Sequence, residues 1–336
     1  MTAKKIKAID VHAHIFDEPM MEGIRKLAPD LGCKLTDVDD KQGRLHIGHI
    51  QQWPHPRGIW DMSIRLKDMD ENDVDIQVLS QAPQTFLYDL DASLVAETSR
   101  MINECMAACV KQHPTRLKAI AAVPLQDGKK AADELRHAMT KLGMQGMQIG
   151  TNVKQKNLDD PSLEPLWATA EELGAFILMH PQFVIPTDRF KDYYFRNFIG
   201  NPLETTIGAA SLVFGGVMER HPNLKICLSH AGGYIPYQMG RFRHGWDVRE
   251  DAKPRLKVSP EASFRRFYFD TLSHFDGALQ FLVNNYTADH GLLGSDYPFD
   301  MGNLDCPAVV KRQQISGMDK ETILYRNAEQ LLKMKY

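Results

Sequence analysis

Short apolar runs alternate with longer amphipathic stretches along most of this chain. Eight runs have the β-branched, apolar character of buried strands, and they cover residues 8–14, 75–80, 117–123, 146–150, 175–180, 224–230, 267–271 and 291–296. Helical periodicity lies between them, at residues 64–71, 92–112, 129–142, 162–173, 205–220, 233–243 and 277–285, with two further helices after the last strand. A strand followed by a helix, repeated about eight times, predicts an α/β fold of the distorted (β/α)₈ TIM barrel type.

One segment departs from this alternation. Residues from about 16 to 60 lose clear periodicity and carry Gly, Pro, Asp and His. A polar segment of this length within an α/β chain reads as an insertion or elaborated loop, and long loops in compact domains are usually functional. We therefore predict a single barrel domain over residues 1–336 with a small inserted loop or subdomain after the first strand, near the active site.

The charge balance and the cysteines narrow the class of partner. The formal net charge is −3 and the basic residues are dispersed, which argues against nucleic acid and anionic membranes and favours a small molecule. No run approaches ~18 apolar residues. The five cysteines follow no disulfide or zinc-ribbon spacing, so we expect a reducing, cytoplasmic location. They are Cys33, Cys105, Cys109, Cys227 and Cys306.

The chemistry is expected where the strands end, because barrel enzymes place their active sites at the carboxyl ends of the strands. The first strand carries His12 and His14, which face the same side because side chains on a strand alternate. The fifth ends in His180, the sixth in His230 and the last in Asp296. One such residue alone is usually solvated or caps the next helix. Four histidines and a carboxylate at one rim indicate a metal site.

Imidazole nitrogens and one carboxylate oxygen suit a single divalent ion, zinc first, with Mn²⁺, Fe²⁺ or Co²⁺ as alternatives. If His12, His14, His180 and Asp296 are the ligands, a water of lowered pKa can fill the remaining position. His230 then either ligates the metal or acts as a general acid or base. Asp10 either accepts a hydrogen bond from an imidazole or has a structural role inside the barrel.

Eight motifs follow one another over nearly the whole chain. They are Asp10-Val11-His12-Ala13-His14, Gln148-Ile149-Gly150-Thr151, His180-Pro181, Glu204-Thr205-Thr206-Ile207, Phe214-Gly215-Gly216-Val217, Ser229-His230-Ala231-Gly232-Gly233, Gly240-Arg241 and Gly294-Ser295-Asp296-Tyr297-Pro298-Phe299. In them the chain resembles the amidohydrolase superfamily, in the amidohydrolase-2 branch that contains the 2-amino-3-carboxymuconate-6-semialdehyde decarboxylases.

The resemblance implies one metal ion, held by His12, His14, His180 and Asp296, with His230 as the essential acid–base residue. The lysine that bridges two metals in other superfamily members has no counterpart, since the fourth strand ends in Gln148-Ile149-Gly150.

The resemblance also implies a homodimer in which Arg241 reaches the neighbouring active site. The decarboxylases carry a substrate-binding arginine in the insertion, several residues before a Trp-Asp pair, and here only Arg57 is available. They have a tryptophan after the proline that follows the metal histidine, and here it is Gln182. Phe299 is a further candidate, because its ring could pack on a planar substrate.

The leading hypothesis is a metal-dependent, non-oxidative decarboxylase of an unsaturated or aromatic carboxylic acid, with His230 and Asp296 as catalytic residues. The alternative keeps the same site in a metal-dependent hydrolase, in which metal-bound hydroxide attacks a C–C, lactone or amide bond of an aromatic-catabolism intermediate. A third reading is a barrel that binds a metal or ligand without turnover.

Overall fold

The computed structural model describes residues 7–334, so both ends of the predicted domain, residues 1–6 and 335–336, lie outside it. Eight parallel strands in this part of the chain form two sheets, in the orders β1-β5-β6 and β13-β12-β11-β10-β7. The strands are β1 (Ile9–Ile15), β5 (Ile76–Gln81), β6 (Leu117–Ala119), β7 (Gly146–Ile149), β10 (Phe176–Met179), β11 (Lys225–Leu228), β12 (Tyr268–Asp270) and β13 (Gly291–Leu292).

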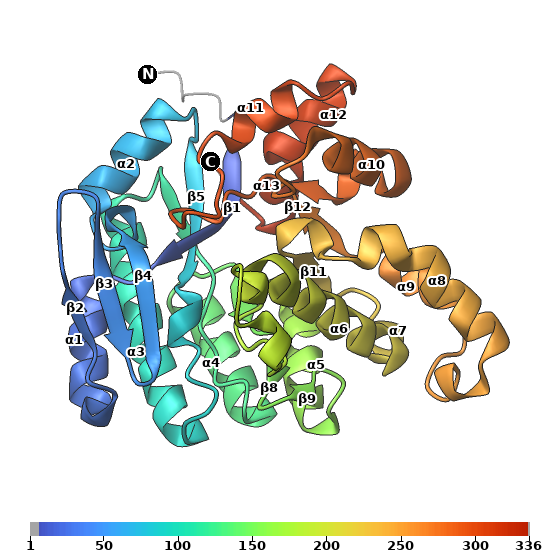
Figure 1. Ribbon diagram of the computed structural model, residues 1–336, viewed down its shortest axis with the longest axis horizontal. Coiled ribbons are helices and arrows are strands. Elements are labelled where there is room, and N and C mark those ends of the chain that lie inside the picture. The colour runs from blue at the N-terminus through green and yellow to red at the C-terminus, as the bar shows by residue number, and fades with distance from the viewer. Residues whose placement is uncertain (1–6, 335–336) are drawn as a thin grey trace.

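Single bridges join the two sheets at both seams. Ala121 pairs with Met147 between β6 and β7, and Ala13 pairs with Tyr297 between the segment after β13 and β1. The eight strands thereby close into the predicted barrel (Figure 1). Six of the eight predicted runs continue past the carboxyl ends of the observed strands; the last strand, for example, ends at Leu292 rather than at residue 296. The extra residues in several of these runs are the polar ones that carry the candidate site.

Helices surround the barrel. They are α2 (Met62–Glu71), α3 (Ala92–Gln112), α4 (Gly128–Lys141), α5 (Glu164–Leu173), α6 (Asn201–Phe214), α7 (Val217–Arg220), α8 (Ile235–Val248), α9 (Pro260–Phe264), α10 (Asp276–Tyr286), α11 (Cys306–Lys311), α12 (Gly317–Glu321) and α13 (Asn327–Leu331). Several of these helices begin with an aspartate whose carboxylate accepts hydrogen bonds from the free backbone N–H groups of the first turn. Asp61 does so for α2 and Asp91 for α3.

The single helix expected over residues 205–220 is two helices. The chain breaks after Phe214, because Gly216 adopts a left-handed backbone with φ of 74°, a conformation that glycine reaches without a steric penalty. The first of the two helices also begins earlier, at Asn201.

The segment between β1 and β5 contains regular structure that its weak periodicity did not reveal. It forms α1 (Glu18–Leu27) and an antiparallel sheet of β2 (Lys34–Thr36), β3 (Gln42–Ile47) and β4 (Ile50–Pro56). In Figure 1 these blue elements lie on the opposite side of the molecule from α8, which projects outward. Most of the strands in this sheet are only partly buried, which is why they lack a clear apolar pattern.

No helix in the described part of the chain has both the length and the apolar character needed to cross a membrane.

Candidate metal centre and active site

The five polar residues expected at the barrel rim come from four separate strands. His12 and His14 lie within β1, His180 follows β10, and His230 follows β11. Asp296 lies four residues after the end of β13. His230 and Asp296 both have a positive φ, 54° and 57°. Non-glycine residues in that backbone region are uncommon and concentrate at functional sites.

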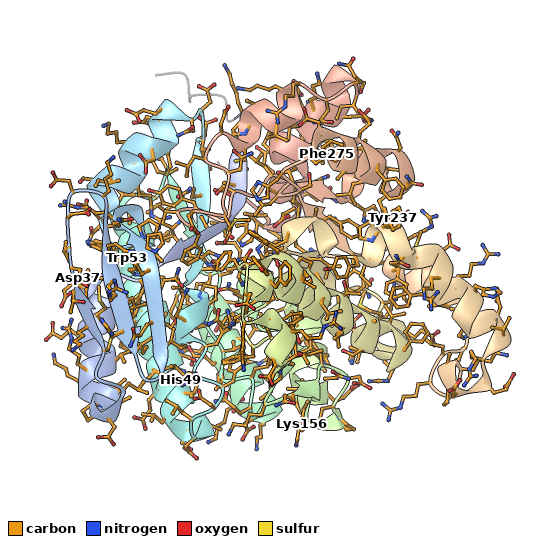
Figure 2. The ribbon with its side chains drawn as sticks, viewed as in Figure 1. Asp37, His49, Trp53, Lys156, Tyr237 and Phe275 are labelled. Atoms are coloured by element: carbon orange, nitrogen blue, oxygen red, sulfur yellow. The ribbon has the colours of Figure 1, made fainter. Side chains whose placement is uncertain are left out.

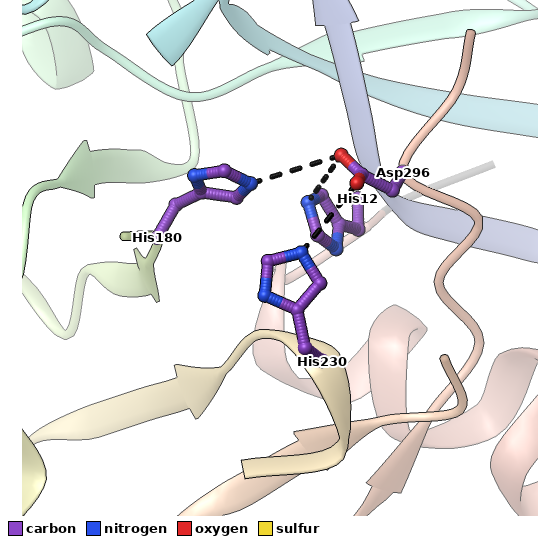
Figure 3. A group of neighbouring side chains, drawn as sticks. All are labelled: His12, His180, His230 and Asp296. Atoms are coloured by element: carbon purple, nitrogen blue, oxygen red, sulfur yellow. Dashed lines mark ion pairs between the residues drawn. The ribbon is translucent and has the colours of Figure 1, made fainter. Parts of the chain in front are cut away.

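The carboxylate of Asp296 lies close to all four histidines, and Figure 3 shows its pairs with His12, His180 and His230. Its Oδ1 atom is 3.0 Å from His14 Nε2, 3.2 Å from His12 Nε2 and 3.7 Å from His180 Nε2. Its Oδ2 atom is 3.5 Å from His230 Nε2. The structure thus brings together all four expected metal ligands and the expected acid–base residue.

The donor set fits a divalent cation. One ligand atom from each of His12, His180, His230 and Asp296 lies within 4.8 Å of the others. His14 adds an Nε2 atom 3.1 Å from that of His12. Both ring nitrogens of His180 are buried without a hydrogen-bond partner in the described residues, and such buried polar atoms require an explanation. A metal ion bound at this point would provide one for the nitrogen that faces the group.

Electrostatics favour the ligating forms of three of these groups. Burial lowers the pKa of His14 and of His180, so both rings are neutral at neutral pH. Burial alone would raise the pKa of Asp296, but the surrounding histidines, His12 foremost, hold it well below its usual range. Burial would also lower the pKa of His12, yet Asp296 and Asp270 outweigh that effect and raise it to about 10. Metal ligation requires this ring to lose its extra proton.

Asp270, the last residue of β12, is a functional residue that the sequence reasoning missed. Its Oδ2 atom is 2.7 Å from His12 Nδ1 and accepts the backbone amide of His230 at 3.0 Å. Its Oδ1 atom accepts the amide of Ala231 at 2.7 Å. A carboxylate on the far nitrogen of a ligating histidine fixes its tautomer and orientation. The sequence feature that could have identified Asp270 is its place near the carboxyl end of an otherwise apolar strand.

Asp10 has a structural role inside the barrel and does not accept a hydrogen bond from an imidazole among the described contacts. Its carboxylate accepts hydrogen bonds from the amides of His12 and Ser295, both at 3.1 Å, and from Gln77 Nε2 at 3.1 Å. It therefore ties β1 to β5 and to the segment that carries Asp296.

Hydrogen bonds to its ring and to its backbone hold His14 in place. Its Nδ1 atom lies 3.1 Å from the carbonyl oxygen of Gln81 and 3.1 Å from Ser80 Oγ, which leaves Nε2 facing Asp296. The buried guanidinium of Arg65 donates to the carbonyl oxygen of His14 and to Gln77 Oε1. These contacts fix the ring on the side away from the cluster.

The loop after His180 is anchored by three polar contacts, two of them partly buried. Asn152 Nδ2 donates to the carbonyl oxygen of Phe183 at 2.7 Å, and Glu204 Oε1 accepts the amide of Ile185 at 2.9 Å. Arg196 donates to the carbonyl oxygen of Gln182 at 2.6 Å. The backbone at the expected substrate residue Gln182 is therefore fixed.

The other expected substrate residues occupy different places. The ring of Phe299 lies 5.4 Å from that of His14, at the metal centre. Arg57 forms an ion pair with Asp61 at 3.1 Å, so its charge is already compensated within the chain. Arg241 is exposed on α8 and lines a separate cavity of about 690 Å³ with Trp246.

A cavity of about 600 Å³ opens beside the cluster and is lined by His230 and Asp296. Most of its other lining residues are apolar, and apolar pockets with a few polar groups are typical small-molecule sites.

Comparisons with known proteins agree with this geometry. The family model described as amidohydrolase matches residues 9–334. The 2-amino-3-carboxymuconate-6-semialdehyde decarboxylase of Dictyostelium discoideum is 37% identical over 275 residues, covering 81% of this chain and 77% of that protein. A gamma-resorcylate decarboxylase from Polaromonas sp. is 29% identical and covers 84% of this chain and 91% of the relative.

Solved structures show the same fold. A dihydroxybenzoic acid decarboxylase from Polaromonas sp., described with bound manganese and the inhibitor 2-nitroresorcinol, superposes with a TM-score of 0.82 at 25% identity, over 98% of this chain and 97% of that one. The 5-carboxyvanillate decarboxylase of Sphingomonas paucimobilis also gives a TM-score of 0.82, at 24% identity, over 98% and 100% of the chains. The family match spans almost the whole chain, and this protein belongs to the amidohydrolase family.

Proposed function

We propose that the protein is a metal-dependent carboxy-lyase that removes carbon dioxide, without oxidation, from an aromatic or unsaturated carboxylic acid. The observation that carries the proposal is the convergence of His12, His14, His180 and Asp296 with His230, beside a largely apolar cavity. The relatives named above are decarboxylases, which supports the same reaction class here.

His12, His14, His180 and Asp296 would hold one divalent ion, with zinc favoured by the nitrogen-rich donor set and manganese favoured by the Polaromonas structure. When bound, the ion supplies positive charge that anchors the substrate carboxylate.

The five cysteines form no disulfide among the described residues, which supports the expected reducing, cytoplasmic location.

His230 would supply the proton. It lines the cavity, and its Nε2 atom lies beside Asp296. When carbon dioxide leaves, the electron pair of the broken C–C bond stays on the substrate carbon, and a proton must fill that position. A positioned histidine contributes about 10²–10⁴-fold to such a proton transfer. Asp270 holds the backbone of His230 and Ala231, which keeps the proton donor in place.

Phe299 would pack on the planar substrate beside His14, and Gln182 and Arg57 are the further contacts expected from the sequence. Arg241 would bind the substrate carboxylate in the neighbouring subunit of a homodimer, because a guanidinium binds a carboxylate through two parallel hydrogen bonds. Its exposure on the projecting helix α8 supports this assignment.

Product analysis tests the proposal. Protein loaded with Mn²⁺ or Zn²⁺ is incubated with 2,6-dihydroxybenzoate, 5-carboxyvanillate or 2-amino-3-carboxymuconate 6-semialdehyde, the acids named for its relatives. We expect carbon dioxide release from at least one of them, and a loss of about 10²–10⁴-fold in kcat in His230→Asn with metal content unchanged. Products that gain water and release no carbon dioxide would instead establish the hydrolase.

A further inference from the structure

Aromatic side chains from three segments line the cavity beside the metal centre. They are Phe198 in the π-helical turn that precedes α6, Tyr237 of α8, and Phe275 and Phe281 at the start and within α10. Tyr237 and Phe275 are 80% and 70% exposed, and both lie on the same side of the molecule (Figure 2). Asp296, which lines the same cavity, is buried. The cavity therefore runs from the buried metal centre to an aromatic opening at the surface.

The two exposed rings are packed although solvent reaches them. The Phe275 ring lies on the first turn of α10, where a Cβ atom at Gly277 would be 2.7 Å from Phe275 Cε1. The centroid of the Tyr237 ring is 6.3 Å from that of Phe281, so α8 and α10 meet at this opening. Exposed apolar side chains gathered beside a polar site are typical of a surface that binds a ligand or partner.

Beyond the metal centre the cavity offers few polar groups to a ligand. No lysine or arginine is among its lining residues in the described part of the chain. Ser273 Oγ donates to the carbonyl oxygen of Phe275 at 3.0 Å, and His274 Nε2 donates to that of Met301 at 2.9 Å. A second carboxylate on the substrate would lose water here without gaining a positive partner, which is costly. An apolar ring would instead pack on the aromatic walls through its faces and edges.

The cavity is also large for a single ring. Its volume of about 600 Å³ is in the range of sites that bury most of a drug-sized ligand. A one-ring acid with its carboxylate at the metal centre would leave much of this space, and the aromatic opening, unfilled.

We propose that the substrate is a monocarboxylic acid with a second aromatic ring, attached to the ring that carries the carboxylate. The inference rests on the proposed function, which puts the carboxylate at the metal centre. The second ring packs against Tyr237 and Phe275 at the opening of the cavity. Removal of its apolar surface from water then favours binding.

Equilibrium binding of simple aromatic acids tests the inference. The dissociation constants of benzoate, biphenyl-3-carboxylate and biphenyl-4-carboxylate are measured by calorimetry on metal-loaded protein, together with the 4′-carboxylated form of each biphenyl. We expect at least one biphenyl monocarboxylate to bind about tenfold more tightly than benzoate, because it buries a second ring. The corresponding dicarboxylate should lose this gain, because its second charge meets no basic side chain in the cavity.

Variants at the opening locate the second ring. Tyr237→Ala and Phe275→Ala should each lower the ratio of the benzoate and biphenyl constants by about 2–10-fold, since each removes one aromatic contact. Tyr193→Ala is the matched control. Tyr193 is 79% exposed, like Tyr237, but is not among the described residues that line the cavity, so this variant should keep the ratio. Thermal unfolding and metal content are recorded for each protein.

Three results would overturn the inference. The first is that neither biphenyl monocarboxylate binds more tightly than benzoate. The second is that the dicarboxylate binds as well as the monocarboxylate. The third is that Tyr193→Ala lowers the ratio as much as the two cavity variants do.

A second copy of the chain over the opening is a different occupant, and it gives a different result. Tyr237→Ala and Phe275→Ala would then weaken self-association, measured by sedimentation equilibrium, and leave the ratio of the ligand constants unaltered. That outcome also overturns the inference.

The two proposals fail in different measurements. If no acid releases carbon dioxide while the gain from the second ring depends on Tyr237 and Phe275, the decarboxylase assignment is wrong and the two-ring ligand class stands. If carbon dioxide is released but the second ring brings no gain, the reverse holds.

Discussion

His12 Nδ1 lies 2.7 Å from Asp270 Oδ2, and the same carboxylate accepts the backbone amides of His230 and Ala231. One side chain therefore orients a proposed metal ligand from the first barrel strand and a proposed proton donor from the sixth. Disturbing Asp270 should affect metal binding and catalysis together.

Asp270→Asn should weaken metal affinity by about 10–100-fold, because the amide is a poorer acceptor for the imidazole N–H and no longer fixes its tautomer. Metal titration followed by calorimetry measures the change. Asp10→Asn is the matched control, since this buried carboxylate on β1 contacts no imidazole nitrogen among its described hydrogen bonds. A weaker affinity in the control than in Asp270→Asn would contradict the assignment.

Metal binding should stabilise the folded protein, because the ligands converge only in the native state. At an ion concentration 100 times the dissociation constant, the free energy of unfolding should rise by about 2.7 kcal/mol relative to chelator-treated protein. Urea denaturation measures this increment. We expect His180→Ala to lose most of it. His221→Gln should keep it, since His221 binds Glu164 and Glu171 instead. An increment retained in His180→Ala would exclude His180 as a ligand.

Arg241 can be assigned to its own or the neighbouring site by mixing inactive subunits. If it crosses the interface, Arg241→Ala and His230→Ala proteins mixed after reversible dissociation should recover about one quarter of the activity, because half of the dimers then contain one complete site. If it serves its own subunit, no activity returns. Arg243→Ala is the control; Arg243 lies on the same helix and pairs with Glu261 at 3.4 Å, so this variant alone should remain active.

The buried ring of His55 should make the free energy of unfolding sensitive to acid. Its ring is buried, stacks on Trp60 at a centroid distance of 5.5 Å, and has no hydrogen-bond partner for either nitrogen among the described residues. Burial lowers its pKa from 6.5 to about 3. The ring stays neutral in the folded protein while the unfolded chain takes up a proton below pH 6.5. The contribution of the neutral His55 ring to the free energy of unfolding is therefore intact above pH 6.5 and is lost as the pH falls toward 3.

Within this pH window, His55 should add a slope of about 1.4 kcal/mol per pH unit to the dependence of the unfolding free energy on pH. His55→Phe, which preserves an aromatic ring against Trp60, should show a shallower loss of unfolding free energy between about pH 6 and pH 4, measured by urea denaturation. His49→Gln should retain the original slope, because His49 is exposed. Identical slopes in His55→Phe and the unaltered protein would show that His55 does not titrate on unfolding.

The barrel and the rim histidines were predictable from the sequence because both depend on local pattern. Buried parallel strands read as apolar runs, and a polar residue at the end of such a run lies at the active-site rim. The run ending in His180 illustrates this, since the strand stops at Met179 and the next residue enters the cluster.

Other features depend on contacts between distant segments. In the antiparallel sheet, β2 and β4 are largely unburied and show no apolar period, and only the six residues of β3 alternate between buried and partly buried positions. The roles of Asp10 and Asp270 could not be separated by pattern, because both are aspartates in apolar strands, and only the fold decides which one meets an imidazole.

The barrel seam has a consequence for how the protein is made. His14 and Asp296 are 282 residues apart in sequence and meet where Ala13 pairs with Tyr297. The chain must therefore be synthesised past residue 296 before the proposed binding site can form, and any product truncated before that residue lacks one proposed ligand. Metal bound at this site would thus report that the segment after β13 has joined β1.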